Sequence, residues 1–371
     1  MQVSETEQVS ETEIAALRRQ SSSAPSAPAP AVGSEYAELS RLVREAGLLH
    51  RRTRYYTWKI VGTVGALAGG WLAFVVVGSS WWTVAVAGLL AVMFTQVGFL
   101  GHDAGHRQIF TSRRSSYIAG VLLGNLGIGL SYGWWVAKHN RHHAHPNTEG
   151  ADPDISGGAL IFAATETDRA PRGVVRFIRE YQAYLFFPML LFEGVNLHVA
   201  SVRALARPAA RHRRSEAALL AAHFAGYLAL VVLVLGPGLK AAVFIMVQQG
   251  LFGLYLGCSF APNHKGMPIL TAADRTDFLR RQVLTSRNIR GGWLTDLVLG
   301  GLNYQIEHHL FPSAPRPSLR HCQPVVRAFC EQRGLTYCQT SLVVSFASVL
   351  GHLDRVGRPV ATGRPATGTA N

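Results

Sequence analysis

The sequence predicts an all-α integral membrane protein with four transmembrane helices arranged as two hairpins. Of its 371 residues, 48% are hydrophobic and only 16% are charged. The apolar residues gather in four blocks that contain no Asp, Glu, Lys or Arg: 60–77, 81–100, 217–235 and 241–261. Each block is close to the roughly 20 apolar residues that a helix needs to cross a bilayer. This distribution excludes a simple soluble globule.

Basic residues at the ends of the blocks predict their orientation. They cluster before the first block and before the third, whereas the connections 78–80 and 236–240 carry almost none. By the positive-inside rule, both termini and the long central segment face the cytoplasm of this multi-pass protein. A nucleic-acid groove would be another use of the net charge of +14, but no recognition motif accompanies the basic residues, so we expect no nucleic-acid partner.

The two ends of the chain are predicted to be disordered tails. Residues 1–35 contain a tandem Gln-Val-Ser-Glu-Thr-Glu repeat and a Ser/Ala/Pro run, without the early apolar segment of a signal peptide. We therefore predict a tail at 1–35, one membrane domain at 36–352 and a second tail at 353–371. The four cysteines form no CxxC pair and are interpreted as reduced thiols.

Two further apolar stretches decide the topology. Residues 117–136 are interrupted by five glycines, and residues 181–200 carry Pro188, Glu193 and His198. Such polar and helix-breaking residues are costly in the hydrocarbon of a bilayer. We interpret both stretches as interfacial or re-entrant segments, which leaves four spans. His198, like His223 inside the third block, is interpreted as a polar helix-packing residue.

Most of the fifteen histidines fall into three clusters, which read HDAGH (102–106), HNRHHAH (139–145) and QIEHH (305–309). His264 stands apart, after Pro262. Histidines three or four residues apart lie on one face of a helix, where two imidazoles can reach one ion. In the predicted topology all three clusters emerge at the cytoplasmic ends of spans. We therefore expect them to converge on one metal site.

The number and type of ligands indicate two iron ions. A structural zinc ion needs four ligands, and a zinc protease helix needs an HExxH motif, whereas Asp103 follows His102 here. Eight or nine neutral imidazoles suit two transition metals, and iron can activate oxygen where zinc, which lacks redox chemistry, cannot. We predict two Fe²⁺ ions, with O₂ as a co-substrate.

The motifs HDAGH, HNRHHAHPN and QIEHHLFP resemble the three histidine boxes of membrane fatty acid desaturases, and the resemblance covers roughly residues 37–350. It implies four transmembrane helices under a cytosolic cap that holds a di-iron site. It also implies that the irons use oxygen and two electrons to remove two hydrogens from an acyl chain. Gln305, at the start of the third box, is similar to the front-end and linoleoyl-type branch. That branch often has a fused cytochrome domain, and we expect none in this chain.

The resemblance further implies which residues bind the metals. Matched by motif, these are His102, His106, His139, His142, His143, His308 and His309. His264 resembles an extra ligand that acyl-CoA desaturases supply after the fourth span. Gln305, His145 and Asp103 are candidates to hold ligands in place, as are the nearby Asp152, Asp154 and Glu307. Gln305 is also a candidate for direct ligation or for shaping the site alone, and a surface position for His145 stays open. Trp134 and Trp135 either line an acyl channel or belong to a membrane-interface belt.

The expected chemistry defines the partners. An unactivated methylene has no acidic proton, so we predict no side chain that acts as a catalytic acid or base. The substrate is expected to be a lipid or acyl-CoA in a narrow apolar channel, with its head group near Arg287, Arg290 and Lys265. No Cys cluster and no dinucleotide-binding motif is visible, so a separate ferredoxin-like or cytochrome-like protein, with its reductase, should supply electrons.

Two other functions remain open at this stage. An acyl hydroxylase would use the same histidines, because hydroxylation and desaturation diverge only after the first hydrogen is removed. A metal transporter or sensor would bind metal transiently, but transporters carry polar ligands near the bilayer midplane, often in repeated halves. Here the blocks are apolar at their centres and no repeated halves are visible.

Overall fold

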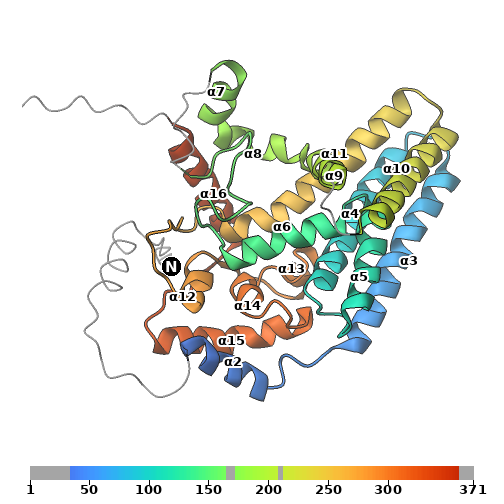
Figure 1. The fold of residues 1–371 in the computed structure, drawn as a ribbon. Helices are drawn as coiled ribbons and strands as arrows, with labels where there is room; N and C mark the ends of the chain where they lie inside the picture. The colour runs from blue at the N-terminus through green and yellow to red at the C-terminus, as the bar shows by residue number, and fades with distance from the viewer. Residues whose placement is uncertain (1–33, 164–171, 208–211, 359–371) are drawn as a thin grey trace, which may run out of the picture.

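The protein folds almost entirely into helices, which confirms the predicted all-α class (Figure 1). The structure, a computed structural model, describes residues 34–163, 172–207 and 212–358. Within those ranges the only strands are β1 (Asn288–Ile289) and β2 (Gln339–Thr340), which pair in parallel. The body of the predicted N-terminal tail, residues 1–33, lies outside the described residues.

Four helices are long and apolar enough to cross a membrane, as predicted: α3 (Thr53–Val77), α4 (Thr83–Gly105), α10 (Arg213–Leu235) and α11 (Leu239–His264). They form a bundle in which α4 packs against both α3 and α11 (Figure 1). Aromatic rings fill its centre, with ring centroids 4.5 Å apart for Phe74 and Phe244 and 5.7 Å apart for Phe94 and Phe252. All four rings are buried.

Most of residues 181–200, the second of the two interrupted apolar stretches, lies in a bent pair of helices, α8 (Gln182–Leu190) and α9 (Glu193–Ala206). Helix α7 (Gly173–Glu180) precedes the pair. The pair bends by 72°, and the number of candidate spans rises to five if it is one broken span. It lies directly against α11, because a Cβ on Gly253 would be only 2.5 Å from the backbone nitrogen of Gly194. This close approach requires glycine at residue 253.

Residues 117–136, the first of the two interrupted apolar stretches, turn back inside the protein. The stretch begins as α5 (Arg113–Val121), continues as a π-helix (Leu122–Gly127), turns at Gly129 with φ of 71° and returns as α6 (Tyr132–Ala144). Two ring nitrogens reach the carbonyls of this turn at 2.8 Å, His198 Nδ1 that of Gly129 and His223 Nδ1 that of Leu126. Irregular backbone at membrane depth needs such partners. These two histidines therefore support the fold.

The remaining helices form a cap with its own core: α2 (Glu35–Glu45), α12 (Phe278–Leu284), α13 (Trp293–Val298), α14 (Gln305–Leu310) and α15 (Arg316–Gln332). Buried side chains of α2, α12, α14 and α15 pack together, at the lower left of Figure 1. The hydroxyl of Tyr36 donates to the carbonyl of Leu310 at 2.8 Å, which fastens α2 to α14.

The C-terminal domain boundary predicted at residue 352 lies inside the last described helix. Helix α16 (Leu342–Gly357) continues past residue 352, because Leu353 is fully buried with Phe186 of α8 and Val349. Apolar contact with α8 therefore extends the folded domain into the segment that was predicted to be a tail. Residues 359–371 lie outside the described part of the chain.

One buried carboxylate fixes the start of α6. Glu216, in the first turn of α10, accepts hydrogen bonds from Ser131 Oγ at 2.9 Å, the backbone nitrogen of Gly133 at 3.1 Å and Asn125 Nδ2 at 3.4 Å. A negative charge at the N-terminus of a helix also complements its dipole. Glu216 thus ties the helix that carries the second histidine cluster to a span helix.

Replacing Glu216 should destabilise the protein. In Glu216→Ala, two buried side-chain donors and the half-buried backbone N–H of Gly133 lose this carboxylate as an acceptor, so we expect the free energy of unfolding to fall by roughly 2–4 kcal/mol. Glu216→Gln keeps an acceptor oxygen and should lose less than half of that. Thermal unfolding in detergent measures both, with Glu45→Ala, at an exposed ion pair, as the control. Equal stability of the Glu216→Ala and Glu45→Ala proteins would contradict this role.

Candidate metal centre

The three histidine clusters lie at the ends of elements that meet between the span bundle and the cap. His102 and His106 stand at the C-terminal end of α4, and His264 is the last residue of α11. The second cluster lies on α6, and His308 and His309 lie on the short helix α14. Two span helices, one re-entrant helix and one cap helix therefore contribute to the same region.

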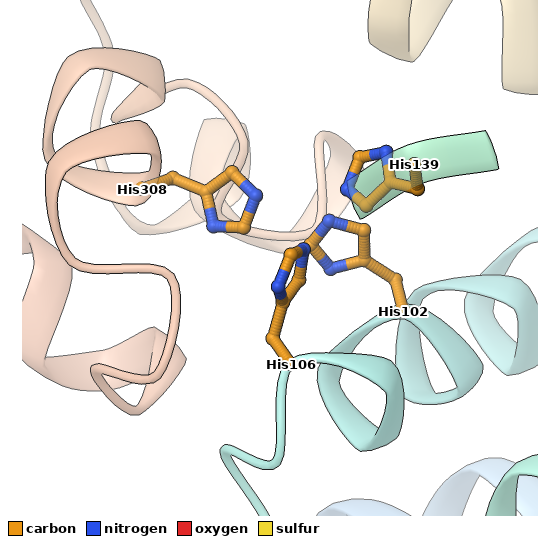
Figure 2. A group of neighbouring side chains, drawn as sticks. All are labelled: His102, His106, His139 and His308. Carbon is orange, nitrogen blue, oxygen red and sulfur yellow. The ribbon is translucent and has the colours of Figure 1, made fainter. Parts of the chain in front are cut away.

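The first group of imidazoles consists of His102, His106, His139 and His308, whose candidate ligand atoms lie within 4.8 Å of one another. Figure 2 shows the four rings pointing toward one another from α4, α6 and α14. Ring centroids are 4.7 Å apart for His102 and His308 and 4.9 Å apart for His106 and His139. Four nitrogen donors around one point form a possible binding site for one metal ion.

The second group consists of His142, His264 and His309. His142 Nε2 lies 3.3 Å from His264 Nε2, and Gln305 Nε2 lies 2.8 Å from the same His264 nitrogen. The amide nitrogen and oxygen of Gln305 are interchangeable in such an assignment, so either atom can face this group. Three imidazoles and one amide therefore surround a second point.

His143 connects the two groups. Its Nε2 lies 3.1 Å from His139 Nε2 in the first group, and its ring stacks on that of His309 in the second, with centroids 4.1 Å apart. All eight histidines that the sequence marks as ligands thus lie in one buried region, together with Gln305. The arrangement can accommodate two neighbouring metal ions.

Hydrogen bonds to the second ring nitrogen orient the imidazoles of the second group. His142 Nδ1 lies 3.0 Å from both carboxylate oxygens of Asp152, and His309 Nδ1 lies 2.8 Å from Gln282 Oε1. His264 Nδ1 lies 2.9 Å from the carbonyl oxygen of Thr285. When Nδ1 carries the proton, Nε2 is left with a lone pair that can face a metal.

Burial favours the neutral form of five imidazoles that lie outside the span helices. Desolvation by burial, followed by repulsion among neighbouring rings, lowers the pKa of His106, His139, His143, His308 and His309 well below the usual range. Neutral imidazole is the form that binds metal.

Several buried ring nitrogens find no hydrogen-bond partner among the described residues: His102 Nε2, His106 Nε2, His143 Nδ1, both nitrogens of His308 and His309 Nε2. Buried polar atoms are nearly always hydrogen-bonded, so such a cluster of exceptions requires a specific cause. A metal ion bound by these atoms would satisfy them. The donor set therefore fits the predicted metals.

Asp103 lies beside the first group and links it to the cap. Its Oδ1 is 3.4 Å from His102 Nδ1, and its Oδ2 forms a buried ion pair with Arg316 Nη2 at 2.6 Å. Arg316 also donates to the carbonyl of Phe99 in α4 at 2.9 Å. The structure thus places Asp103 where a residue that orients His102 would lie.

Two sequence-based candidates lie elsewhere. His145 is exposed at the end of α6, with Nδ1 3.4 Å from Arg281 Nη1, and belongs to neither histidine group. The helix ends at this residue, so its side chain does not follow the helical face of His142. Arg287 is buried and donates to the carbonyls of Pro262 and Lys265, so it does not present a free charge to a head group.

Trp135 lies against the first group, and its ring stacks on His139 with centroids 4.5 Å apart. A Cβ on Gly105 would be 2.7 Å from Trp135 Cζ3, so the glycine of HDAGH makes room for this indole.

Sequence reasoning did not identify Gln282 or Thr285, whose roles arise from contacts across long stretches of chain. No local pattern distinguishes them from other polar residues of a helix.

Comparison with known proteins agrees with this geometry. A family model described as fatty acid desaturase matches residues 79–341. An acyl-lipid (9-3)-desaturase of Physcomitrium patens is 32% identical over 90% of this chain, although the match covers only 65% of its own length. A Delta(6)-fatty-acid desaturase of Caenorhabditis elegans is 29% identical over 88% of this chain and 75% of its own. A Delta(8)-fatty-acid desaturase of Helianthus annuus is 26% identical, with coverage of 84% and 70%.

The family model covers more than half of the sequence, including all three histidine motifs. The predicted family is therefore confirmed, and the chain belongs to the fatty acid desaturase family.

Proposed function

We propose that this protein is an oxygen-dependent fatty acyl desaturase that introduces a double bond into an acyl chain at a histidine-ligated di-iron centre. The observation that carries the proposal is the pair of buried histidine groups joined by His143. One ion would be held by the first group and the other by the second group with Gln305, while His143 faces both.

Iron fits this donor set better than the alternatives. Imidazole nitrogens bind several transition metals, but desaturation requires an ion that changes its oxidation state. When bound, the iron pair would supply the oxidising chemistry that breaks unactivated C–H bonds, with O₂ as a co-substrate. The protein holds the imidazoles neutral and orients them, chiefly through Asp152, Gln282 and Asp103.

The surroundings of the first group suit an acyl chain. Trp135 stacks on His139, and the ring of Phe260 lies with its centroid 6.4 Å from that of His102. These apolar rings lie near the start of α6 and near the end of the candidate span α11. The relatives named for acyl-lipid, Delta(8) and Delta(6) desaturation support an acyl substrate, carried by a lipid or by CoA.

The proposed topology places the metal centre and both termini on the cytoplasmic side of the membrane. This orientation follows from the basic residues that flank α3 and α10, which by the positive-inside rule face the cytoplasm. The four candidate spans support a multi-pass location.

Electrons are proposed to come from a separate ferredoxin-like or cytochrome-like protein with its reductase. Within the described ranges, none of the candidate metal groups contains a cysteine, and Cys322 and Cys330 are buried as free thiols. The net charge of +14 would attract an acidic donor through long-range electrostatics.

Product analysis tests the proposal. Expression in a host that lacks polyunsaturated lipids should yield acyl chains that have lost two hydrogens, located by derivatisation and mass spectrometry. His142→Ala should lose iron and activity together, by orders of magnitude, because it removes a ligand of the second group. His50→Ala, at an exposed histidine before α3, should change neither.

Other outcomes of the same experiment would contradict the proposal or identify a different function. Acyl chains that gain one oxygen would identify a hydroxylase. Full activity and full iron content in the His142→Ala protein would refute the di-iron site, and iron binding without any acyl product would favour a metal sensor or transporter.

Asp152 should control metal affinity through His142. In Asp152→Asn the carboxylate that orients His142 Nδ1 becomes a neutral amide, so we expect iron affinity or activity to fall about 10–100-fold. Iron content by mass spectrometry and thermal unfolding in the same preparation separate loss of metal from loss of fold. Glu149→Gln, on the same loop but in neither histidine group, is the matched control. Iron content equal to that of the control would contradict the orienting role.

Turnover should depend on a second protein. Pure, chemically pre-reduced enzyme is expected to complete at most about one turnover, because restoring the reduced iron pair requires electrons from outside the chain. Sustained turnover should appear only with an added donor and reductase, and it should fall as ionic strength screens the attraction between them. Multiple turnovers from NADPH alone would show that the chain carries its own redox domain.

A further inference from the structure

A cavity of about 460 Å³ lies outside the histidine groups, where the start of α3 meets α13 and the start of α15. Its wall includes Tyr55 and Lys59 from α3, Trp293 and Asp296 from α13, and Arg316 and Arg320 from α15. The proposed reaction uses none of these side chains directly. Three of them are basic and one is acidic.

The cavity lies at the membrane interface. Lys59 stands in the second turn of a candidate span, α3. Helix α13 is fastened to two other spans, because Gln96 Nε2 donates to the carbonyl of Leu297 at 3.1 Å and the hydroxyl of Tyr255 donates to that of Val298 at 2.7 Å. The outer face of α13 is apolar, with Trp293 72% exposed and Leu294 56% exposed. An exposed tryptophan on a short apolar face is typical of the lipid head-group region.

Lys59 is the basic residue of this wall that has no carboxylate partner among the described residues. Arg316 pairs with Asp103, and Arg320 pairs with Asp296. Lys59 Nζ contacts the amide oxygen of Gln96 at 3.1 Å, and no carboxylate of the described residues lies within ion-pair distance of it. A charged side chain at this depth is costly without an anionic partner, so it indicates a functional site.

We infer that this cavity binds the phosphate of a membrane glycerophospholipid, with Lys59 as its counter-ion. Phospholipid phosphates are the anions that are abundant at this depth, next to the apolar carbons that Trp293 and Tyr55 can contact. Because Arg316 is paired with Asp103 and Arg320 with Asp296, one positive charge remains on the wall, and it favours a singly charged phosphodiester. Arg316 forms part of this wall and also pairs with Asp103 beside His102, so the bound lipid lies directly behind the first histidine group.

This lipid site requires neither iron nor catalysis, so it is tested by binding alone. Protein purified and delipidated in a non-ionic detergent is mixed with phosphatidylglycerol, and bound lipids are counted by native mass spectrometry. Wild-type protein should retain one lipid that diacylglycerol with the same acyl chains, which lacks the phosphate, does not replace. Lys59→Met should weaken binding by at least about tenfold, the usual effect of losing one charge-assisted hydrogen bond.

The matched control is Lys240→Met. Lys240 lies near the ring of Trp81, at the opposite ends of the spans, and its replacement should leave binding unchanged. Arg320→Gln provides a second variant on an exposed side chain, in case Lys59→Met does not fold. It removes a positive charge from the wall and leaves Asp296 without its ion-pair partner, so it should also weaken binding.

Three results would overturn the inference. In the first, phosphatidylglycerol binds with equal affinity to wild-type protein and to the cavity variant that folds. That result would show that the positive charge of the wall does not contribute to lipid binding. Equal binding of diacylglycerol would remove the role of the phosphate. Displacement of the lipid by millimolar inorganic phosphate would assign the cavity to a soluble phosphate compound and refute the lipid assignment.

Discussion

The arrangement of this protein depends on the burial of imidazole nitrogens that the described chain does not hydrogen-bond. Five histidines each bury at least one such atom, and all five belong to the connected histidine region. Leaving one buried polar atom unsatisfied costs about 1–3 kcal/mol, so the set is unfavourable unless another group binds it. Under the proposed function, metal ions are that group, and metal binding then contributes directly to the stability of the fold. The rest of the structure can be understood as a frame that keeps these rings in place.

That frame is assembled from parts that are distant in sequence. The span helix α4 delivers His102 and His106, while the cap helix α14 delivers His308 from the far end of the domain. The buried pair of Asp103 and Arg316 crosses the same boundary between spans and cap. Breaking a buried ion pair leaves an uncompensated charge, so the pair resists separation of the two parts. Its position beside His102 couples the stability of the cap contact to the geometry of the first group.

Much of this was predictable from the sequence, because its signals are local. Apolar length identified the four spans, the three histidine motifs identified seven side chains that the fold brings together, and the family resemblance added His264. The limits of the prediction have a physical origin as well. Gln282 orients the imidazole of His309 through a contact that only the folded chain creates. Likewise, the tail predicted from residue 353 is partly helical, because Leu353 packs against a helix more than a hundred residues away.

The re-entrant stretch illustrates a different limit. Its glycines correctly indicated that residues 117–136 do not form one straight span, but they did not indicate how the exposed backbone is satisfied. His198 and His223 supply ring nitrogens to two carbonyls of the turn, and Glu216 supplies acceptors to the start of α6. All three belong to helices α9 and α10, which follow in sequence. His198 is one of the polar residues that made residues 181–200 look unsuited to a membrane, and it is one of those that support the turn.

The depth of the candidate metal centre follows from the same geometry and bears on how the proposed substrate would reach it. His102 lies two residues beyond Leu100, the end of the apolar block, so at 1.5 Å per residue it stands only about 3 Å past that block along α4. Trp135 and Phe260 continue the apolar surface up to the rings. An acyl chain that is already in the bilayer could therefore approach the histidines laterally, with its apolar carbons never crossing bulk water. A water-soluble acyl carrier would instead have to transfer its chain across the interface. The shallow position of the site thus favours a substrate that is delivered from the membrane.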